Sequence, residues 1–583
     1  MAAAADPIVA SVIQHRLFAI VEEMGEAMLR TSYSQILNSS RDFSTGSCDP
    51  EGRLIAQAEH VPIHVGALPW AARSVTEFFK GDVHPGDVFL LNDPYHGGNH
   101  LPDLTAFVPV FEDGKLTFWS INRSHQSDIG GATHGAYNAA ATEIWQEGLR
   151  ITPLRLYDKG ELRRDVYEMI VTNVRHPRDF RGDLAAMIGS ARIGERRMQA
   201  LIAEFGSEQS HVAIEAILDS AERQARAVIA SWKDGVYKGE AFLDDDGHKY
   251  EDVHIRATVT KKGSDLTIDL TDSHQQVVGF INSSYPNMRS AVAMALAYLI
   301  DPHTPKNDGT FRPLTVLAEP GTVVWANPGA PVTLATNHCA QEIMEAIIKA
   351  LAPACPDRAM AGWGRRFRIA IQGTDPRLER PFIWHLFQAR PGGGGSSAGD
   401  GWPGGGEWQA AGGIKFGSME VTEVRFPLFF ERHEFRVDSG GDGKFRGGPG
   451  CVLDLRMEIE EPALGNTAGD GARYGACGML GGKDGLPHRY VLRSRRRPDR
   501  VIKTKEVGIE IRPGDVFHIL SGGGGGWGLG KDRDAAARAS DVVNGFASRA
   551  AKPKTKAKAK PKTRKAKSIA RKPAPKRAAK RRR

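Results

Sequence analysis

The most informative part of the sequence is the segment 88–125, which reads VFLLNDPYHGGNHLPDLTAFVPVFEDGKLTFWSINRSH. Its apolar runs predict a buried strand that ends at Asp93 and two longer strands on either side of Asp113 and Gly114. An Asp-Gly pair between apolar runs is typical of a two-residue hairpin turn. Pro109 lacks a backbone donor, which places its strand near a sheet edge or a bulge. We therefore expect an antiparallel hairpin that follows a loop rich in glycine and proline.

The hairpin turn also determines which residues face each other across the two strands. With Glu112 opposite Lys115, position 103 falls opposite 124 and position 102 opposite 125, so Asp103 lies beside His125. Opposed Cβ atoms are about 5 Å apart. His100 precedes Asp103 in the same loop. Two imidazoles and one carboxylate at one point are the ligands of an open metal site that suits Mn, Fe or Zn.

Other polar residues close to this point are candidates for the same site. His96 is a possible fourth ligand, and Asp93 and Asp128 are placed to accept hydrogen bonds from the ligand imidazoles. Asp128 or His96 could also carry a proton during a reaction. A lone histidine in a loop more often satisfies nearby backbone groups, but the convergence of several such residues favours a metal site.

The rest of the chain predicts a mixed α/β (α+β) body of several lobes. A first helix is expected to have Asp6 as its N-cap and Pro7 as its first residue. Glycine accounts for 65 of the 583 residues, which indicates many tight turns. We expect four regions, which are an N-terminal metal-site region (1–234), a β-rich region (235–325), a C-terminal mixed α/β region with glycine-rich β segments (326–545) and a disordered basic tail (546–583).

Composition narrows the class of protein. The five cysteines are few and odd in number, and they contain no CxxC pair, which argues against a disulfide framework and against a thiolate zinc site. The N-terminus lacks the layout of a signal peptide, and the longest apolar stretch, 291–300, is about half a membrane span. These features predict a cytoplasmic protein that does not enter a membrane.

The C-terminal tail carries a charge opposite to that of the body. Residues 551–583 contain 17 Lys or Arg and no Asp or Glu, so the net charge of +8 leaves −9 for residues 1–550. A segment of this composition cannot bury enough apolar surface to fold. It predicts binding to a polyanion such as nucleic acid, and a nucleic-acid-associated protein is therefore an alternative class.

Common catalytic motifs are missing from the sequence. It contains no HExxH, no GxSxG and no GxxxxGK[ST]. The glycine run 521–528 is the nearest candidate for a phosphate cradle, although such runs more often make tight turns. The run 392–406 is more typical of a mobile loop. Glu143 and Glu147, at i,i+4 spacing, fit a solvated helix face better than a place in the site.

Several ordered motifs resemble those of the hydantoinase B/oxoprolinase family, which includes the N-methylhydantoinase beta subunit and the metal-bearing subunit of acetone carboxylase. The resemblance covers roughly residues 7–530. The motifs are EEMGEAMLRTSYS (22–34), GRLIAQAEHVPIHVGALP (52–69), NDPYHGGNHLPD (92–103), RSHQSDIGG (123–131), EGLRITPLRL (147–156), NVRHPRDFRGDLAA (173–186), GTFRPLTV (309–316), DSGGDGKFRGGPG (438–450) and SGGGGGWG (521–528).

The resemblance implies a metal site and a second subunit. In the acetone carboxylase relatives, the histidine and aspartate of the HLPD motif and a histidine on the returning strand hold manganese, and these match His100, Asp103 and His125 here. Family members work with a hydantoinase A-like subunit that binds ATP through an actin/Hsp70-like fold. We therefore expect one divalent metal (Mn, Zn or Fe) in this chain, and ATP with Mg²⁺ on the partner.

Two motifs depart from the family pattern. HQSD (125–128) stands where the family usually has His-His-Ala-Asp, and SSRDFS (39–44) lacks the acid of the family's Lys-Glu-Arg-x-Asp-Phe-Ser motif. Substrate contacts near residue 40 could therefore differ. Arg41 and Asp42, together with Arg123, are the candidate substrate-binding residues.

The leading prediction from the resemblance is a subunit that opens a cyclic amide, such as a hydantoin, 5-oxoproline or a lactam, while a partner supplies ATP. Phosphorylation of the ring carbonyl oxygen would create a better leaving system, and the metal would activate a water for attack. An ATP-dependent ketone carboxylase subunit of the acetone or acetophenone type is the alternative among enzymes.

Overall fold

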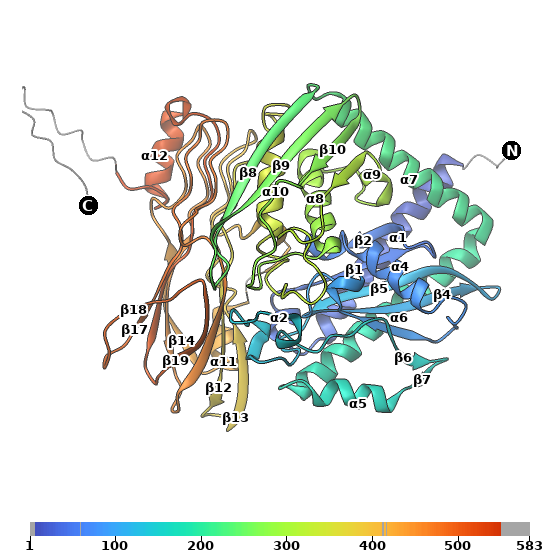
Figure 1. Ribbon diagram of the computed structural model, residues 1–583, viewed down its shortest axis with the longest axis horizontal. Coiled ribbons are helices and arrows are strands. Elements are labelled where there is room, and N and C mark those ends of the chain that lie inside the picture. The colour runs from blue at the N-terminus through green and yellow to red at the C-terminus, as the bar shows by residue number, and fades with distance from the viewer. Residues whose placement is uncertain (1–5, 59, 411–412, 416, 550–583) are drawn as a thin grey trace, which may run out of the picture. The chain divides into compact units, whose positions relative to one another are not determined.

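The computed structural model describes residues 6–549, except 59, 411–412 and 416 (Figure 1). The chain divides into two units, Met1–Ala547 and Ser548–Arg583. All the described helices and strands belong to the first unit. The basic tail and its predicted disorder lie outside the described residues. The narrower boundaries expected within the body, at 234 and 325, stay predictions.

A seven-stranded antiparallel sheet organises the N-terminal part of the chain (Figure 1). The predicted hairpin forms the centre of this sheet. In spatial order the strands are β2 (Leu54–Ala58), β1 (Phe43–Cys48), β5 (Lys115–His125), β4 (Asp103–Glu112), β3 (Val88–Leu91), β6 (Leu154–Asp158) and β7 (Glu161–Leu162). The central strands are buried on both faces, which explains their nearly continuous apolar runs.

The turn between β4 and β5 has the predicted form. Asp113 has a φ of 47° and Gly114 a φ of 74°, and a two-residue turn of type I′ requires positive φ at both positions. Pro109 lies beyond Phe107, the last residue of β4 that pairs with β3. Its missing N–H therefore breaks no ladder hydrogen bond to that neighbour, which is the reason that β4 tolerates a proline.

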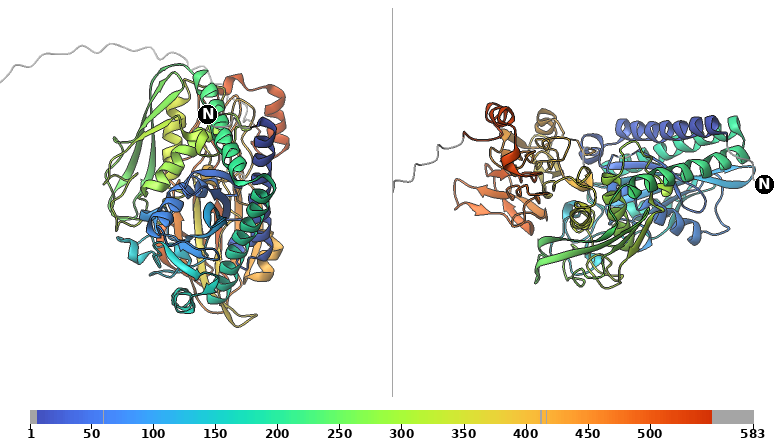
Figure 2. Two further views of the ribbon diagram at one scale, coloured as in Figure 1. Left: turned by 90° about the vertical axis from the view of Figure 1, so that its right-hand side faces the viewer. Right: turned by 90° about the horizontal axis from the view of Figure 1, so that it is seen from above.

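Helices cover both faces of the seven-stranded sheet. The long helix α1 (Pro7–Thr31) packs along α6 (Pro177–Phe205) and α7 (Ser207–Ala230), as Figure 2 shows, and α6 lies against β4 and β5. Asp6 caps α1 as predicted, because its carboxylate accepts the N–H of Ile8 at 2.8 Å. The shorter helices around the sheet are α2 (Gln35–Asn38), α3 (Pro62–Val65), α4 (Leu68–Phe78) and α5 (Arg164–Thr172).

A four-stranded sheet follows in the sequence. Its strands in spatial order are β11 (Leu314–Leu317), β10 (Asp265–Asp269), β9 (Glu251–Lys262) and β8 (Gly235–Asp245). Buried and less buried residues alternate along β8 and β9, as expected for a sheet with one covered face. The helix α10 (Ala340–Leu351) packs on both strands and on α8 (Tyr285–Leu299), and the short α9 (Asp308–Phe311) precedes β11.

Two more sheets form a sandwich in the C-terminal part. One sheet contains β13 (Arg380–His385), β12 (Phe367–Asp375), β16 (Ala463–Gly469) and β19 (Lys505–Ile511), and the other contains β14 (Leu428–Phe435), β15 (Cys451–Met457), β20 (Val516–Leu520), β17 (Arg489–Arg493) and β18 (Arg500–Val501). Phe367, Ile369 and Ile371 of β12 fill the space between them, and the ring of Phe367 stacks on Tyr490 at 3.9 Å. Two helices, α11 (Met419–Arg425) and α12 (Ala535–Val543), lie in the same part of the chain.

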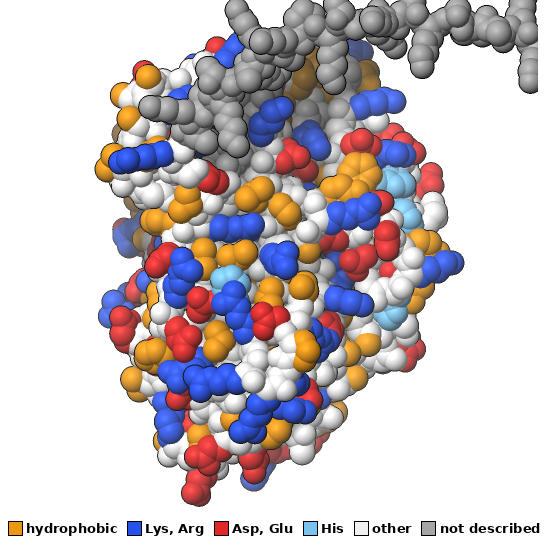
Figure 3. All heavy atoms as spheres, turned by 90° about the vertical axis from the view of Figure 1, so that its left-hand side faces the viewer, with side chains coloured by type: hydrophobic (Ala, Val, Ile, Leu, Met, Phe, Trp, Pro, Cys, Tyr) orange, Lys and Arg blue, Asp and Glu red, His pale blue; other side chains and the backbone are white. Residues whose placement is uncertain are grey.

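The side of the body on which β14, β17 and β18 lie carries mixed charge. Figure 3 shows acidic and basic side chains intermingled there. Several form surface ion pairs, such as Arg432 with Glu434 at 2.6 Å and Arg456 with Glu431 at 2.9 Å. A surface of alternating sign creates little net field, so this face does not favour a polyanion.

The glycine-rich segments form an ordered array rather than a mobile loop. The array consists of 391–406, 438–450, 475–485 and 521–528, whose backbones bond to one another. The N–H of Gly524, for example, donates to the carbonyl of Gly448 at 2.9 Å, and the N–H of Gly441 donates to Gly524 at 2.8 Å. The N–H groups of residues 522–528 all have protein acceptors, so this run has no free donors with which to cradle a phosphate.

Close packing explains why the array needs glycine. A Cβ added to Gly525 would lie 1.9 Å from the carbonyl oxygen of Cys477, which is far inside van der Waals contact. The expectation of a mobile loop at 392–406 was therefore wrong, because composition does not reveal that distant glycine segments bond to each other. None of the described helices is long and apolar enough to cross a membrane.

Candidate metal centre

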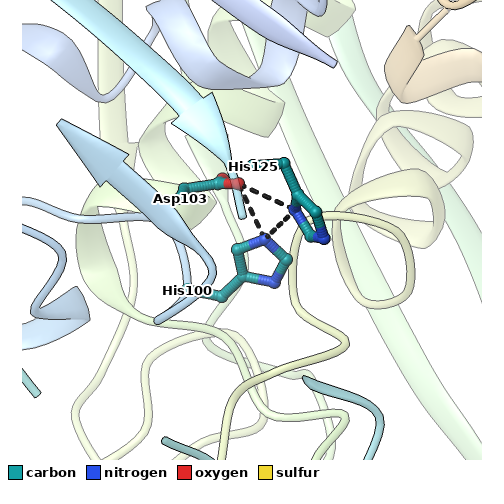
Figure 4. Close-up of side chains that lie close together, drawn as sticks. All are labelled: His100, Asp103 and His125. Atoms are coloured by element: carbon teal, nitrogen blue, oxygen red, sulfur yellow. Dashed lines mark hydrogen bonds and ion pairs between the residues drawn. The ribbon is translucent and has the colours of Figure 1, made fainter. Parts of the chain in front are cut away.

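The three predicted ligands meet at one point inside the body (Figure 4). Nε2 of His100 lies 2.9 Å from Oδ1 of Asp103, and Nδ1 of His125 lies 3.0 Å from the same oxygen. The two nitrogens are 3.1 Å apart. All three residues are buried. We call His100, Asp103 and His125 the triad.

Strand register brings the triad together. Asp103 is the first residue of β4 and His125 the last of β5, and the two pair directly. The simple turn register placed Ser124 opposite Asp103, which was wrong by one residue. A bulge between Val110 and Phe111 shifts the ladder and adds that residue. The shift brings Asp103 and His125 closer together than the simple register does.

The loop before β4 delivers His100. The backbone N–H of Asp103 donates to the carbonyl of His100 at 3.1 Å, which folds the loop back over the start of the strand. Gly98 lets the loop pass close to β3, because a Cβ there would lie 2.3 Å from the carbonyl oxygen of Asn92. The glycines of the NDPYHGGNHLPD motif therefore have a structural reason.

The hydrogen bonds around the triad fit a bound cation. Nδ1 of His100 donates to the carbonyl of Thr333 at 2.5 Å, so Nε2 presents a lone pair to Asp103 and His125. Three acceptor atoms this close repel one another unless a proton or a cation lies between them. A divalent ion satisfies all three, whereas one proton bridges two. Oδ2 of Asp103 and Nε2 of His125 are buried without a hydrogen-bond partner in the described part of the chain.

Local electrostatics favour the metal-binding states of these groups. Burial alone would favour a neutral Asp103, but the charges of His100 and His64 outweigh it and hold the pKa of Asp103 well below its usual value. Burial likewise opposes an imidazolium at His100, yet the Asp103 carboxylate prevails and raises the pKa of His100. At His125 burial is the larger effect and lowers the pKa. Asp103 is thus a carboxylate at neutral pH.

Glu147 positions the triad indirectly. Its carboxylate accepts the backbone N–H groups of Val332 at 2.9 Å and of Thr333 at 2.8 Å, and Thr333 in turn accepts from His100. Burial raises the pKa of Glu147 to about 7. The expectation of a solvated helix face at Glu143 and Glu147 was wrong for Glu147, because these residues flank a short 3-10 turn and not an α-helix.

His64 is a neighbour that sequence reasoning missed. Its Nε2 lies 3.4 Å from Oδ2 of Asp103 and 3.7 Å from Oδ1 of Asp42. The carbonyl of Asp42 accepts the N–H of His125 at 3.0 Å, so Asp42 also lies beside the triad. Both residues are buried. The one sequence signal for His64 is its place in the motif at 52–69.

Asp93, His96 and Asp128 bond to other groups. Oδ2 of Asp93 lies 2.7 Å from Nδ1 of His96 and accepts Nε of Arg150 at 2.7 Å. Asp128 accepts from the backbone and side chain of Arg175, at 2.9 and 3.0 Å. None of the described hydrogen bonds joins these residues to the triad. The acceptor that orients His100 is the carbonyl of Thr333, on a segment more than two hundred positions away, which local spacing cannot indicate.

The arginines expected near a substrate have structural surroundings. Arg123 is fully buried and donates to Thr105 at 2.7 Å, to the carbonyl of His64 at 3.0 Å and to Asn99. Burial lowers the pKa of Arg123 to about 10, so it remains charged at neutral pH. Its donors are used within the protein. Among the described contacts, none links Arg41 to the triad.

A cavity of about 380 Å³ leads from the surface toward the triad. Arg178 and Arg380 line its exposed part, while Ser127 and the buried His385 line its interior. Nε2 of His385 donates to the carbonyl of Ser127 at 3.1 Å, and Ser127 follows His125 by two positions. Burial lowers the pKa of His385 to about 3, so this imidazole is neutral. The cavity provides a route by which a small molecule could reach the triad.

Known proteins share both the sequence pattern and the fold. Caprolactamase subunit beta from Pseudomonas jessenii is 34% identical over 93% of this chain and 94% of its own length. 5-Oxoprolinase 1 from Arabidopsis thaliana is 26% identical over 89% of this chain, which corresponds to 42% of that protein. These relatives span nearly the whole body described above.

Solved structures have the same architecture. The crystal structure of ATP-dependent caprolactamase from Pseudomonas jessenii superposes with a TM-score of 0.87 at 32% identity, over 93% of this chain and 94% of that one. The nucleotide-free structure of acetone carboxylase gives a TM-score of 0.85 at 20% identity, over 93% and 78%, and shares the fold. The family model for hydantoinase B/oxoprolinase matches residues 6–530. The chain therefore belongs to the hydantoinase B/oxoprolinase family.

Proposed function

We propose that this chain is the metal-bearing subunit of an ATP-dependent hydrolase that opens a cyclic amide in the cytoplasm. The observation that carries the proposal is the end-to-end similarity to caprolactamase subunit beta. A lactam is therefore the first substrate to test. 5-Oxoproline belongs to the same chemical class, as the similarity to 5-oxoprolinase indicates, and hydantoins complete the set.

The triad would hold one divalent ion, with Mn, Zn or Fe as candidates. When bound, such an ion supplies a Lewis acid that polarises a carbonyl group and lowers the pKa of water. Asp103 contributes the negative charge, and Thr333 fixes the ring of His100. His64 lies against the second oxygen of Asp103 and limits its rotation. Burial excludes bulk water, which strengthens each of these interactions.

ATP is best placed on a partner subunit. A ring amide is stabilised by resonance, and phosphorylation of its carbonyl oxygen makes the carbon more reactive toward water. The glycine run 521–528, the nearest phosphate candidate in this chain, has no free N–H groups. The designation of the relative as subunit beta supports a second chain, which we take to be a hydantoinase A-like, ATP-binding subunit.

Ketone carboxylation is less well supported. The acetone carboxylase neighbour is 20% identical, which shows a common fold and not a common reaction. A nucleic-acid role has no support beyond the composition of the tail. The hydrolase proposal therefore stands first.

An assay of the two-subunit complex tests the proposal. The chain is purified with its hydantoinase A-like partner and incubated with caprolactam, 5-oxoproline, hydantoin or acetone, with and without ATP and bicarbonate. We expect ATP-dependent formation of the ring-opened amino acid from at least one cyclic amide, and none from the chain alone. Turnover of acetone with no turnover of any cyclic amide would overturn the proposal.

A further inference from the structure

The strand β12 carries a buried arginine whose donors are almost unused. Arg368 is 3% exposed, and in the described part of the chain its guanidinium makes no hydrogen bond. Oε1 of Glu407 lies 3.8 Å from its Nη2, which is an ion-pair distance but too long for a hydrogen bond. Its Cζ lies 3.8 Å from the ring centre of Phe387. Leaving the five N–H donors of a buried guanidinium without acceptors is costly unless a ligand supplies them.

The register of β12 turns Arg368 away from the sandwich core. Phe367 and Ile369 point into that core, so Arg368 points to the opposite face. Ala370 continues this face and pairs with His385 on β13. His385 interacts electrostatically with both His125 and Arg368. Arg368 and the triad therefore share a neighbour, and that neighbour lines the cavity.

Charge around Arg368 is unbalanced. Three buried arginines, Arg366, Arg368 and Arg390, interact with one buried carboxylate, Glu407. The other partners of Arg366 and Arg390 are neutral, namely the side chains of Asn337 and Tyr137 and the backbone carbonyls of Ile414 and Gly405. Burial lowers the pKa of Arg368 only to about 10, so it is charged at neutral pH. A divalent ion at the triad would add further positive charge to this region.

We propose that Arg368 is the docking group for an oxyanion that binds between β12 and the triad. The planar fork of a guanidinium matches the oxygen spacing of a phosphoryl or carboxylate group and can bind it through two hydrogen bonds. Arg178 and Arg380 at the cavity entrance carry the same sign of charge and would attract such a group.

The inference rests on the proposed function in one respect, which is the source of the oxyanion. An amide activated by ATP carries a phosphoryl group, and ring opening produces a carboxylate. Both present oxygens of suitable geometry to Arg368. Inorganic phosphate and acetate are simple probes that separate the two sources.

Binding measurements on the full-length, Mn²⁺-loaded chain test the inference. Phosphate and acetate are titrated calorimetrically at fixed ionic strength, and ³¹P and ¹³C relaxation reports whether the bound probe lies close to the ion. We expect one site near Mn²⁺ for at least one probe. Arg368→Gln and Arg368→Met should weaken its affinity at least about tenfold, because a charge-assisted, bidentate contact is lost. Arg368→Lys keeps the charge and should recover part of the affinity.

A matched control and a stability measurement separate a ligand role from a structural one. Arg432→Gln removes the same charge from an exposed position on β14 and should bind the probes like the wild type. In the presence of a chelator, Arg368→Met should melt at the same temperature as the wild type or higher, because methionine keeps the packing on Phe387 without an unpaired charge. Failure of Arg368→Met to fold, or equal affinity in Arg368→Gln and Arg432→Gln, would overturn the inference.

The proposed hydrolase activity has a separate outcome. Probe binding needs neither the partner subunit nor ATP. If Arg368 contributes nothing to anion binding while the two-subunit complex still opens a lactam, the oxyanion site is wrong and the function stands. If probe binding depends on Arg368 while no cyclic amide is turned over, the oxyanion site stands and its occupant belongs to another reaction.

Discussion

Asp103 is the residue on which the triad depends. One of its oxygens lies about 3 Å from a nitrogen of each triad imidazole, at 2.9 and 3.0 Å. Asp103→Asn keeps the shape of the side chain but removes its charge, which two neutral imidazoles cannot replace as ligands of a dication. We expect the metal content to fall from about one ion per chain to nearly none, as measured by elemental analysis of the purified protein.

Asp93 provides a matched control for this substitution. It is also fully buried, and its carboxylate lies 2.7 Å from an imidazole, that of His96. Its hydrogen bonds do not reach the triad, so Asp93→Asn should keep its metal. Equal metal content in the two variants would contradict the assignment of the triad.

Glu147 should make stability depend on pH in a defined direction. Its pKa is about 7 in the folded protein and about 4.5 when exposed. The folded state therefore holds this proton more tightly, and the resulting stability is fully present below about pH 4.5 and lost as the pH rises to about 7. Over that window the free energy of unfolding should fall by about 1.4 kcal/mol per pH unit relative to Glu147→Gln. Melting temperatures of both proteins from pH 5 to 8, in a chelator, give the comparison.

Glu143→Gln serves as the reference for this experiment. Glu143 is exposed on the same turn and has no contact with Val332 or Thr333 among the described residues. Its variant should follow the wild type across the pH range. A difference between wild type and Glu147→Gln that does not change with pH would show that Glu147 keeps its charge when folded.

The β4–β5 hairpin depends on a turn whose conformation favours glycine. Gly114 has a φ of 74°, and a Cβ added there would meet no atom within 4 Å. Gly114→Ala therefore tests backbone strain without a steric clash, and it should lower the free energy of unfolding by about 1 kcal/mol. Gly189 in α6 also has open space for a Cβ, but it has a helical backbone. Gly189→Ala should raise stability by up to about 1 kcal/mol.

Melting temperatures of the two alanine variants check this prediction. Opposite shifts are expected, because the same added methyl group meets an unfavourable φ in one position and a favourable one in the other. A stabilised Gly114→Ala would mean that the turn is not of type I′. The distance between Asp103 and His125 would then need another explanation.

This hairpin also shows how far local sequence predicts structure. Asp113-Gly114 correctly identifies the turn and the antiparallel pairing, because type I′ turns have a strong residue preference. The bulge at Val110 leaves no comparable signal, since it arises from packing of both faces of β4 in the sheet. The prediction that Asp103 lies beside His125 was correct, although the simple register on which it rested was wrong by one residue.

The surroundings of the triad could not be predicted from sequence. Thr333, Glu147 and His64 come from three segments that are distant along the chain, and only the folded protein brings them together. Motif resemblance indicated some of these segments but assigned them no contact. Long-range backbone contacts of this kind have no period or composition that a single sequence displays.

At the scale of the whole molecule, the charge of the chain is divided. Residues 551–583 carry 17 positive charges, whereas residues 1–550 carry −9. A chain that ends at residue 550 should lose its retention on heparin at low salt, since each charge that contacts a phosphate or sulfate releases counterions. Activity with the partner subunit should remain, because the triad lies far upstream in the sequence. Chromatography and the lactam assay measure the two effects.

A full-length chain with glutamine at all 17 positions is the control for length. It should behave on heparin like the shortened chain. Loss of activity in the shortened chain, with intact folding and subunit assembly, would show that the tail takes part in the reaction.

The glycine array has a consequence for the timing of isotope exchange. Its composition suggests that residues 522–526 would be among the first to take up deuterium from heavy water. Each of these amides instead donates to a buried acceptor on another segment, and several segments would have to separate before one amide could exchange. Mass spectrometry of peptic fragments should therefore find these amides among the slowest in the protein, with exchange only by large-scale opening. Uptake within seconds would show that the array opens readily. Slow exchange would mean that the part of the chain with the fewest side chains is held most firmly by its neighbours.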